Sequence, residues 1–316
     1  MPHTLAHLGV QGFLGRAARP GADVKWIALG CVLPDVPWIM QRGLRLAFGE
    51  LGWLDPLRPL PVLYDLRLYA VVQASLLWCL LLALAVATLA RRRAEVFGVL
   101  ALGAVLHLLL DAAETKWGNG VVLAAPFHWR EVNFGWFWPE SMVALLLAAT
   151  GVGWVLVTWR NAVASPPELD LRPRRLIVAG ILTAAYLATP LAFLDAAQAD
   201  DAHFVDTLRA DDEHDRARRV GRSIELHRAY YRHRDGVPVV RTLTEEELEV
   251  PGLELEEPGN GARVSVRARF ETPERLEVES WHVHRAGRRD AATYLGLLAI
   301  AAQWTVAWWR ARRASP

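Results

Sequence analysis

Five long apolar runs constrain this chain more than any other feature of its sequence. Each run has 19 to 22 residues, the length that an α-helix needs to cross the hydrocarbon core of a bilayer. Arginines stand at their ends, and most of the 14 tryptophans lie nearby, as in the aromatic belt of a membrane protein. The sequence therefore predicts a mostly α-helical integral membrane bundle rather than the buried helices of a soluble protein. The runs are residues 69–90, 94–113, 141–159, 176–194 and 291–309.

The arginines at the ends of these runs give one consistent orientation. Cytoplasmic loops of membrane proteins carry an excess of Lys and Arg. The basic clusters within 91–93, 160–175 and 310–313 therefore predict three cytoplasmic segments. The charged stretch between the fourth and fifth runs is then outside. We expect a multi-pass protein of the inner (cytoplasmic) membrane whose partners include membrane lipids.

The N-terminal region is apolar but less regular than the five runs. Residues 4–18 and 24–40 are short, and Pro34 and Pro37 must interrupt a helix in the second segment. Broken backbone at membrane depth survives only where protein or a watery cavity covers it. We therefore predict a helical hairpin packed against the bundle, with its basic turn on the cytoplasmic side.

Residues 196–290 have a different composition from the rest of the chain. They carry 21 acidic and 16 basic side chains, whereas residues 1–195 carry 13 and 16 over twice the length. Residues 200–220 are predicted to be helical, and short alternating runs follow them, as in strands with one buried face. The predicted strands are 223–231, 237–242, 252–255, 262–270 and 275–283, and Glu245, Glu246 and Glu247 are interpreted as a solvated turn or the start of a helix.

The predicted organisation has three parts. A membrane domain spans 1–195, a small extracytoplasmic β-rich domain is inserted at 196–290, and a transmembrane helix with a basic cytoplasmic tail follows at 291–316. The number of strands makes the inserted domain OB-like. Such barrels bind many kinds of ligand, so the fold itself names none; an envelope protein or polymer is the candidate partner of residues 196–290.

Several classes of function are excluded or disfavoured by the sequence. The net charge is +1, and the arginines flank apolar runs instead of forming one basic face, so nucleic acid is not an expected partner. No Walker motif, dinucleotide fingerprint, Gly-x-Ser-x-Gly elbow or His-Glu-x-x-His is present. A transporter is a distant possibility, because the intramembrane charges cluster at one face and no inverted repeat is evident.

Four ionisable residues stand out within the apolar segments. Such groups are costly in a membrane and usually functional. His107 and Asp111 are four residues apart and share one helix face, and the predicted topology brings all four near the outer leaflet. Nitrogen and carboxylate ligands suit zinc, with manganese or iron as possible alternatives. The alternative is that Asp35 caps a helix and His107 is a satisfied core histidine. The four candidate metal ligands are His7, Asp35, His107 and Asp111.

Further candidate residues lie close to this predicted site. Glu114 follows Asp111 on nearly the same helix face, as a general base or a solvated helix end. The loop 116–139 is predicted to lie outside, with His128 and Arg130 in it. Arg130 could bind a lipid phosphate, or the loop could simply be anchored at the interface by tryptophans.

Two histidines in the inserted domain form a second, weaker candidate. His282 and His284 alternate on one predicted strand and therefore share a face. Two such residues can ligate a metal, but no third ligand is apparent in the sequence, so a solvated polar face is the favoured interpretation.

The order and spacing of these motifs resemble the LexA-regulated, inner-membrane metal-dependent hydrolase-like family over residues 1–140. The resemblance implies a metal-dependent hydrolase whose ligands would be His7, Asp35, His107 and Asp111. The motifs that carry it are His7-Leu8-Gly9, Leu33-Pro34-Asp35, Leu106-His107 with Asp111, Gly118-Asn119-Gly120, and Leu123 with Pro126.

One segment departs from the family pattern. Relatives have a His-Arg-Gly-x-x-His-Ser stretch at the third helix, where this chain has residues 69–75 with no histidine. Gln73 and Ser75 are the candidate substrate-binding residues there, and Asp65 and Arg67 could line the same cavity. Two hypotheses follow. The chain is a hydrolase of a lipid-like or phosphoester substrate at the outer leaflet, or it is a non-catalytic anchor with a degenerate metal site and a partner-binding outer domain.

Overall fold

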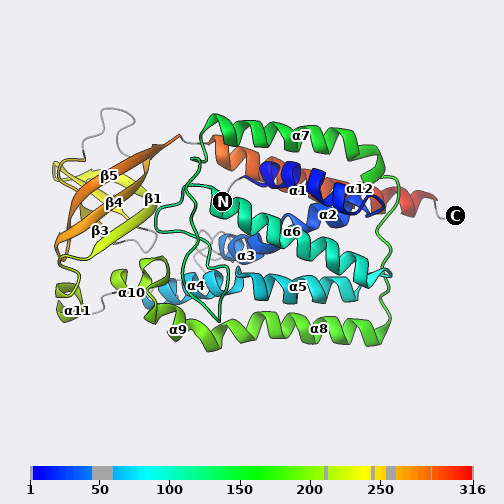
Figure 1. Ribbon diagram of the computed structural model, residues 1–316, viewed down its shortest axis with the longest axis horizontal. Helices are drawn as coiled ribbons and strands as arrows, with labels where there is room; N and C mark the ends of the chain where they lie inside the picture. The colour runs from blue at the N-terminus through cyan, green and yellow to red at the C-terminus, as the bar shows by residue number, and fades with distance from the viewer. Residues whose placement is uncertain are drawn as a thin grey trace.

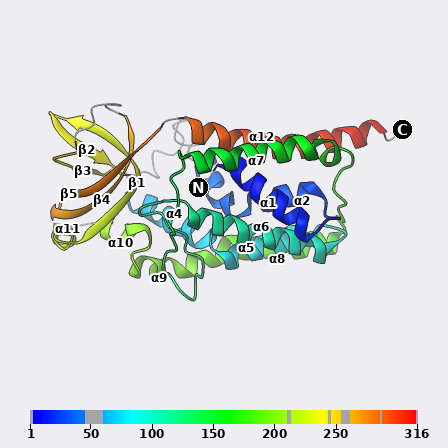
Figure 2. The same ribbon diagram turned by 45° about the horizontal axis from the view of Figure 1, so that its top comes forward.

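The structure consists of a bundle of helices with a small β-barrel at one end. It is a computed structural model that describes residues 3–44, 60–209, 213–242, 246–253, 261–285 and 287–314. The helices lie side by side along the long axis of the molecule, and the strands stand beyond their ends (Figure 1). The turned view in Figure 2 shows the same separation. The predicted combination of a mostly helical chain with a small β-rich unit is confirmed.

Four helices in the described part of the chain are long and apolar enough to cross a membrane. They correspond to four of the five predicted runs, and the remaining run belongs to a bent pair of helices. The four are α6 (Arg93–Ala113), α7 (Met142–Ala162), the stretch Pro173–Ala199 that begins with α8 (Pro173–Ala188), and α12 (Arg288–Ala314); the bent pair is α4 (Leu60–Gln73) and α5 (Leu76–Thr88).

The prediction of one straight helix over 69–90 is wrong. The axes of α4 and α5 differ by 67°. Ser75 has extended backbone and is the N-cap residue of α5, and the next amide, that of Leu76, donates to the carbonyl of Leu123. The loop after α6 therefore bonds a backbone group that the break leaves without a helical partner.

The predicted run 176–194 is also interrupted near its end. α8 stops at Ala188, a short 3₁₀ helix η4 (Thr189–Phe193) follows, and α9 (Leu194–Ala199) continues the chain. Pro190 lies at the start of η4, where its missing N–H and fixed φ end the regular helix.

The N-terminal segments form the predicted hairpin. α1 (Thr4–Ala18) packs against α2 (Val24–Gly30), and the bundle covers both through α6, α7 and α12. The prolines divide the second segment as expected, into α2, the 3₁₀ turn η1 (Leu33–Asp35) and α3 (Val36–Leu44). The broken backbone at η1 is buried by the surrounding protein.

The five strands close into a barrel in the order β1-β2-β3-β5-β4. All pairs are antiparallel except β3 with β5, and alternate side chains such as Ile224, Val266 and Phe270 fill the interior. The strands are β1 (Ser223–Arg234), β2 (Val237–Arg241), β3 (Glu247–Glu249), β4 (Arg263–Thr272) and β5 (Arg275–His284).

Two sequence-based expectations for this region are wrong. The third strand is β3, so Glu247 is in a strand and Gly252 is in a turn. Residue 245 of the predicted turn and residues 254–255 of the predicted strand lie outside the described residues. Glu246 is described and directly precedes β3. The described residues between 200 and 220 form short helices instead of the one helix expected, and Asp201, His203 and Phe204 interrupt the chain there with positive φ. These helices are η5 (Ala202–Phe204), α10 (Val205–Leu208) and α11 (Glu213–Ala217).

The basic turns of the bundle meet at the end opposite the barrel. The Arg91 amide donates to the carbonyl of Glu168, Arg175 donates to the carbonyl of Ala90 (2.9 Å), and Lys25 donates to that of Ala162 (3.1 Å). The turns that were assigned to one side of a membrane by charge alone are therefore in contact with one another.

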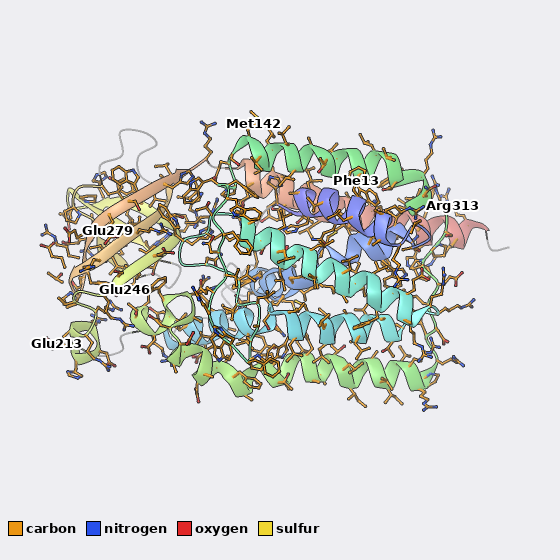
Figure 3. The ribbon with its side chains drawn as sticks, in the orientation of Figure 1. Phe13, Met142, Glu213, Glu246, Glu279 and Arg313 are labelled. Carbon is orange, nitrogen blue, oxygen red and sulfur yellow. The ribbon has the colours of Figure 1, made fainter. Side chains whose placement is uncertain are left out.

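The sides of the bundle expose large apolar side chains. Phe13 and Met142 project outward from α1 and α7 (Figure 3), and leucines, isoleucines and valines of α7, α8 and α12 are similarly exposed. Glu213, Glu246 and Glu279 lie around the barrel instead. Exposed apolar side chains in this number are compatible with a membrane protein.

Candidate metal centre and the cavity beside it

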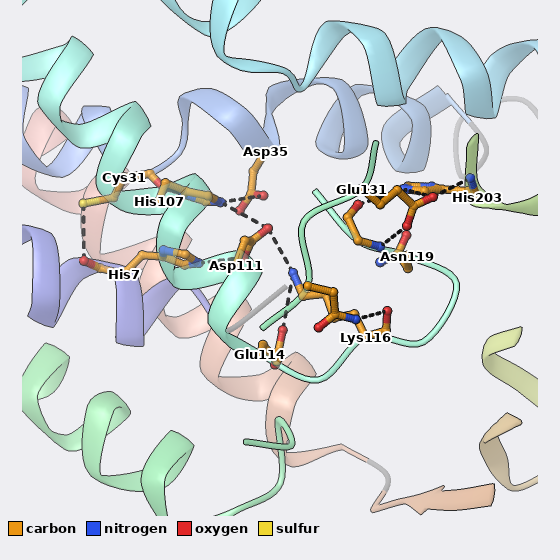
Figure 4. Close-up of polar contacts among 12 residues, drawn as sticks. His7, Cys31, Asp35, His107, Asp111, Glu114, Lys116, Asn119, Glu131 and His203 are labelled. Atoms are coloured by element: carbon orange, nitrogen blue, oxygen red, sulfur yellow. Dashed lines mark hydrogen bonds and ion pairs between the residues drawn. The ribbon is translucent and has the colours of Figure 1, made fainter. Parts of the chain in front are cut away.

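The four predicted metal ligands come together in the structure (Figure 4). α1 supplies His7, η1 supplies Asp35, and consecutive turns of α6 supply His107 and Asp111. The Nε2 atom of His7 lies 3.4 Å from Oδ1 of Asp111, and Nε2 of His107 lies 3.3 Å from Oδ1 of Asp35. All four side chains are buried. Suitable ligand atoms of His7, His107 and Asp111 lie within 4.8 Å of one another.

The protein holds each imidazole by its other nitrogen. Nδ1 of His107 lies 2.7 Å from the carbonyl oxygen of Cys31, which can only accept, so the proton is on Nδ1. Nδ1 of His7 lies 3.1 Å from the Gln11 amide, whose oxygen accepts from it when its nitrogen donates to the carbonyl of Gly103. The two rings stack with centroids 3.7 Å apart. In their neutral form the two imidazoles would therefore direct their Nε2 lone pairs at the carboxylates, the arrangement that metal-binding histidines have.

The atoms that face one another in this group have no hydrogen-bond partner. They are buried, and burying polar atoms without partners is costly. Two carboxylates and two neutral imidazoles carry a formal charge of −2, which one divalent cation would balance. The donor set therefore fits a metal ion such as zinc, manganese or iron. The unpartnered atoms are Nε2 of His7 and His107 and Oδ1 of Asp35 and Asp111.

Lys116 is a member of the site that sequence reasoning missed. Its ammonium lies 3.0 Å from Oδ2 of Asp111 and 3.4 Å from Oε2 of Glu114. Burial alone would lower the pKa of Lys116, but these two carboxylates raise it above its ordinary value. Lys116 is one of only two lysines in the chain. This rarity is the one feature of the sequence that could have pointed to Lys116 as a site residue.

A cavity of about 320 Å³ opens beside this group, between the bundle and the barrel. Asp111 and Lys116 form part of its wall, and Arg67 is in it as the sequence suggested. His203, also in the wall, has its pKa lowered to about 4 by burial, with Arg67 and Lys116 nearby. Apolar side chains also line the cavity: Trp38, Val71, Leu108 and Val122. The barrel contributes His227, Arg228 and Arg263. The other charged lining residues are Arg42 of α3 and Arg289 and Asp290 of α12.

Four predicted substrate-binding residues lie away from this cavity. Gln73 donates to the hydroxyl of Tyr69 and the carbonyl of Tyr186, so it joins α4 to α8. Ser75 occupies the N-cap position of α5, but its hydroxyl donates to the carbonyl of Ala125 and not to the helix. His128 and Arg130 are exposed on the loop after α6. Asp65, considered with Arg67, forms an ion pair with Arg209 instead (2.7 Å).

The two histidines of β5 acquire a third partner that the sequence did not suggest. Glu140, from the loop before α7, lies 2.8 Å from Nδ1 of His284 and 3.4 Å from Nε2 of His282. Burial alone would raise the pKa of Glu140, but hydrogen bonding to the two histidines lowers it to about 2. His284 also bonds Ser265 through Nε2 (2.8 Å), so both its ring nitrogens are occupied. Hydrogen bonds of Glu140 to the two histidines therefore join this loop to the barrel. The three side chains could also hold a metal ion.

No protein-family model, curated protein or solved structure matches this chain. Function is therefore inferred from the geometry and chemistry of the site.

Proposed function

We propose that this protein is a membrane-bound, metal-dependent hydrolase that acts at the outer leaflet of the inner membrane on a lipid-like or phosphoester substrate. The observation that carries the proposal is the convergence of two imidazoles and two carboxylates whose facing atoms lack partners. The resemblance of residues 1–140 to the metal-dependent hydrolase-like family points to the same four residues.

The membrane location is supported by two independent features of the bundle. Its flanks expose large apolar side chains along α7, α8 and α12, and its basic turns gather at one end. By the excess of Lys and Arg in cytoplasmic loops, that end would face the cytoplasm. The barrel would then lie outside, with the candidate site between it and the bundle.

The metal would be held by His7, Asp35, His107 and Asp111. When bound, it would supply an activated water and polarise the ester that the water attacks. Hydrolysis adds the water oxygen to the phosphoryl or acyl centre and a proton to the leaving alcohol. Glu114 is the candidate base, and Lys116 lies between Glu114 and Asp111, where its ammonium can hold an anionic substrate or return a proton.

The barrel is the less specific part of this proposal. Its closed five-stranded order supports the OB-like interpretation. That architecture is compatible with an envelope protein or polymer as a partner, but it names neither of them.

One contact favours the alternative of a non-catalytic anchor. The ammonium of Lys116 already neutralises one oxygen of Asp111, and the segment that carries two histidines in relatives contributes Gln73 and Ser75 to helix packing only. In that case the four-residue group would be a remnant, and the barrel would act through a partner.

Activity on defined lipids tests the proposal. The purified protein is reconstituted in vesicles of phosphatidylethanolamine and phosphatidylglycerol, supplied in turn with zinc, manganese and iron, and products are identified by mass spectrometry. We expect phosphate or fatty acid release with at least one metal, and a loss of 100-fold or more in Asp111→Asn, on the order expected when a metal site fails.

Asp195→Asn, an exposed carboxylate on α9, is the matched control and should keep full activity. Full activity in folded Asp111→Asn would contradict the proposal, and so would the absence of any product with all three metals.

A further inference from the structure

Cations from distant segments of the chain converge on the cavity beside the candidate metal centre. Only two carboxylates, Asp111 and Asp290, are found among the described residues of its wall. Like charges repel at short range, so a cavity with this excess of cations is stabilised by an anion. The cations are Arg42, Arg67, Lys116, Arg228, Arg263 and Arg289.

The backbone at Arg228 is strained in a way that places this side chain in the cavity wall. Its φ is +53°, a left-handed conformation that residues other than glycine rarely adopt. The pairing of β1 with β4 shifts register between Leu226 and Ala229, so Arg228 lies in a β-bulge. Bulges redirect side chains and are frequent next to functional sites.

Arg228 and Arg263 are held in place by the barrel. A guanidinium nitrogen of Arg263 donates to the carbonyl of Arg228 (3.1 Å), and its guanidinium stacks over the ring of Tyr230. Arg228 pairs with Glu140 (3.3 Å). Burial, and then the nearby Arg289, lower the pKa of Arg228. Preorganised guanidinium groups of this kind bind phosphate through paired hydrogen bonds.

The cavity also has an apolar part to its lining. Trp38, Val71 and Leu108 of the helices and Val122 of the loop after α6 contribute it, beside the cations. A volume of about 320 Å³ is at the lower end of the range for ligand pockets, so a headgroup would fit but long chains would not. The cavity therefore matches a compact anion that is joined to an apolar body.

We propose that this cavity binds the phosphate group of a phosphorylated membrane lipid, with Arg228 and Arg263 as its ligands. The inference rests on the proposed function for the role of the site as a substrate subsite, but phosphate binding itself does not require the metal. The barrel is then half of the substrate site rather than only a separate module for partners.

Lipid binding to the full chain tests this inference. Native mass spectrometry of the detergent-purified protein measures the affinity for dioleoyl phosphatidic acid, for dioleoylglycerol, which lacks the phosphate, and for glycerol 3-phosphate, which lacks the chains. We expect phosphatidic acid to bind at least 10-fold more tightly than either other probe. The double variant Arg228→Gln/Arg263→Gln should lose at least 10-fold of that affinity.

Arg269→Gln is the matched control, because Arg269 is exposed on the same strand as Arg263 and does not line the cavity. It should bind phosphatidic acid as the unmodified chain does. Thermal melting of each variant checks the fold, and the single variant Arg228→Gln replaces the double variant if that one does not fold.

Each outcome bears on the inference separately from the proposed function. Binding is measured with and without a chelator, so arginine-dependent binding in the metal-free protein supports the lipid phosphate site even if no hydrolysis is found. Equal affinity for glycerol 3-phosphate and phosphatidic acid would support a phosphate site. It would overturn the inference that the phosphate belongs to a lipid. No binding of phosphatidic acid, or binding that the arginine substitutions leave unchanged, would overturn the inference.

Discussion

Each imidazole of the candidate centre is fixed by a partner on the side away from the carboxylates. Cys31 offers a backbone carbonyl to His107, and Gln11 offers a side-chain amide to His7. These contacts select the tautomer in which Nε2 has a lone pair. Of the two, only the Gln11 contact can be removed by a substitution of the side chain.

Gln11→Ala is therefore expected to weaken metal binding without removing a ligand. Loss of such a supporting contact typically lowers metal affinity about 10–100-fold. Competition with a chromophoric chelator measures the affinity, and Gln198→Ala, which alters a glutamine on α9 far from the ligands in the fold, is the control. An unchanged affinity in Gln11→Ala would show that the orientation of His7 does not depend on this amide.

The ligands themselves were predictable from the sequence, whereas their supports were not. A histidine or an aspartate is conspicuous in an apolar run because its burial is costly. A backbone carbonyl such as that of Cys31 has no sequence signature, and Arg228 is placed by a bulge that strand periodicity does not reveal. Gln73 and Ser75 were chosen by position in a family motif, and packing directs them elsewhere.

The relative position of two helical elements sets the geometry of the centre. Gly103 on α6 faces Gly30 at the end of α2, and a Cβ at Gly103 would lie 2.9 Å from the backbone of Gly30. This close contact is one turn from His107 and shortly before Asp35. Small residues allow helices to approach in this way in membrane bundles.

Gly103→Ala is expected to separate α2 from α6 and lower the free energy of unfolding by about 1–3 kcal/mol, as overpacking of a core does. Metal affinity should fall with it, because Asp35 moves relative to His107. Denaturant titration in detergent and the chelator competition measure the two effects.

Gly98→Ala is the control on the same helix, since a Cβ there meets nothing closer than 4.0 Å. It should be neutral or stabilising, because alanine favours helix over glycine. Equal stability of Gly103→Ala and Gly98→Ala would contradict the proposed role of the contact.

The sequence predicts where helices form far better than it predicts where they break. Hydropathy identifies 94–113 and 141–159 almost to the residue, because α6 and α7 have the length of a span. The bend between α4 and α5 depends on a carbonyl of a distant loop. The composition of residues 69–90 alone therefore does not predict the bend. The third strand was misplaced for a similar reason, since β3 is fixed by pairing with β2 and β5.

At the scale of the whole molecule, the bundle and the barrel enclose one site together. Gly118 in the loop after α6 donates to Glu225 of β1 (2.8 Å), and Glu140 binds His284 of β5. These contacts hold the barrel against the bundle beside the cavity, whose wall includes Asp111 of the four candidate ligands. The sequence predicts the membrane bundle and the inserted domain as separate parts, because charge and hydropathy describe each of them but not the surface between them.

The metal content of the purified protein is the most direct test of whether His7, Asp35, His107 and Asp111 hold a metal ion. Inductively coupled plasma mass spectrometry is applied to the full chain in detergent, beside Asp35→Ala/His107→Ala and the control Asp195→Ala/His128→Ala. We expect about one equivalent of a divalent transition metal in the unmodified chain and in the control, and none in the first variant, as when half of a ligand set is removed. No bound metal after resupply in any sample, or equal metal in all three, would contradict this expectation.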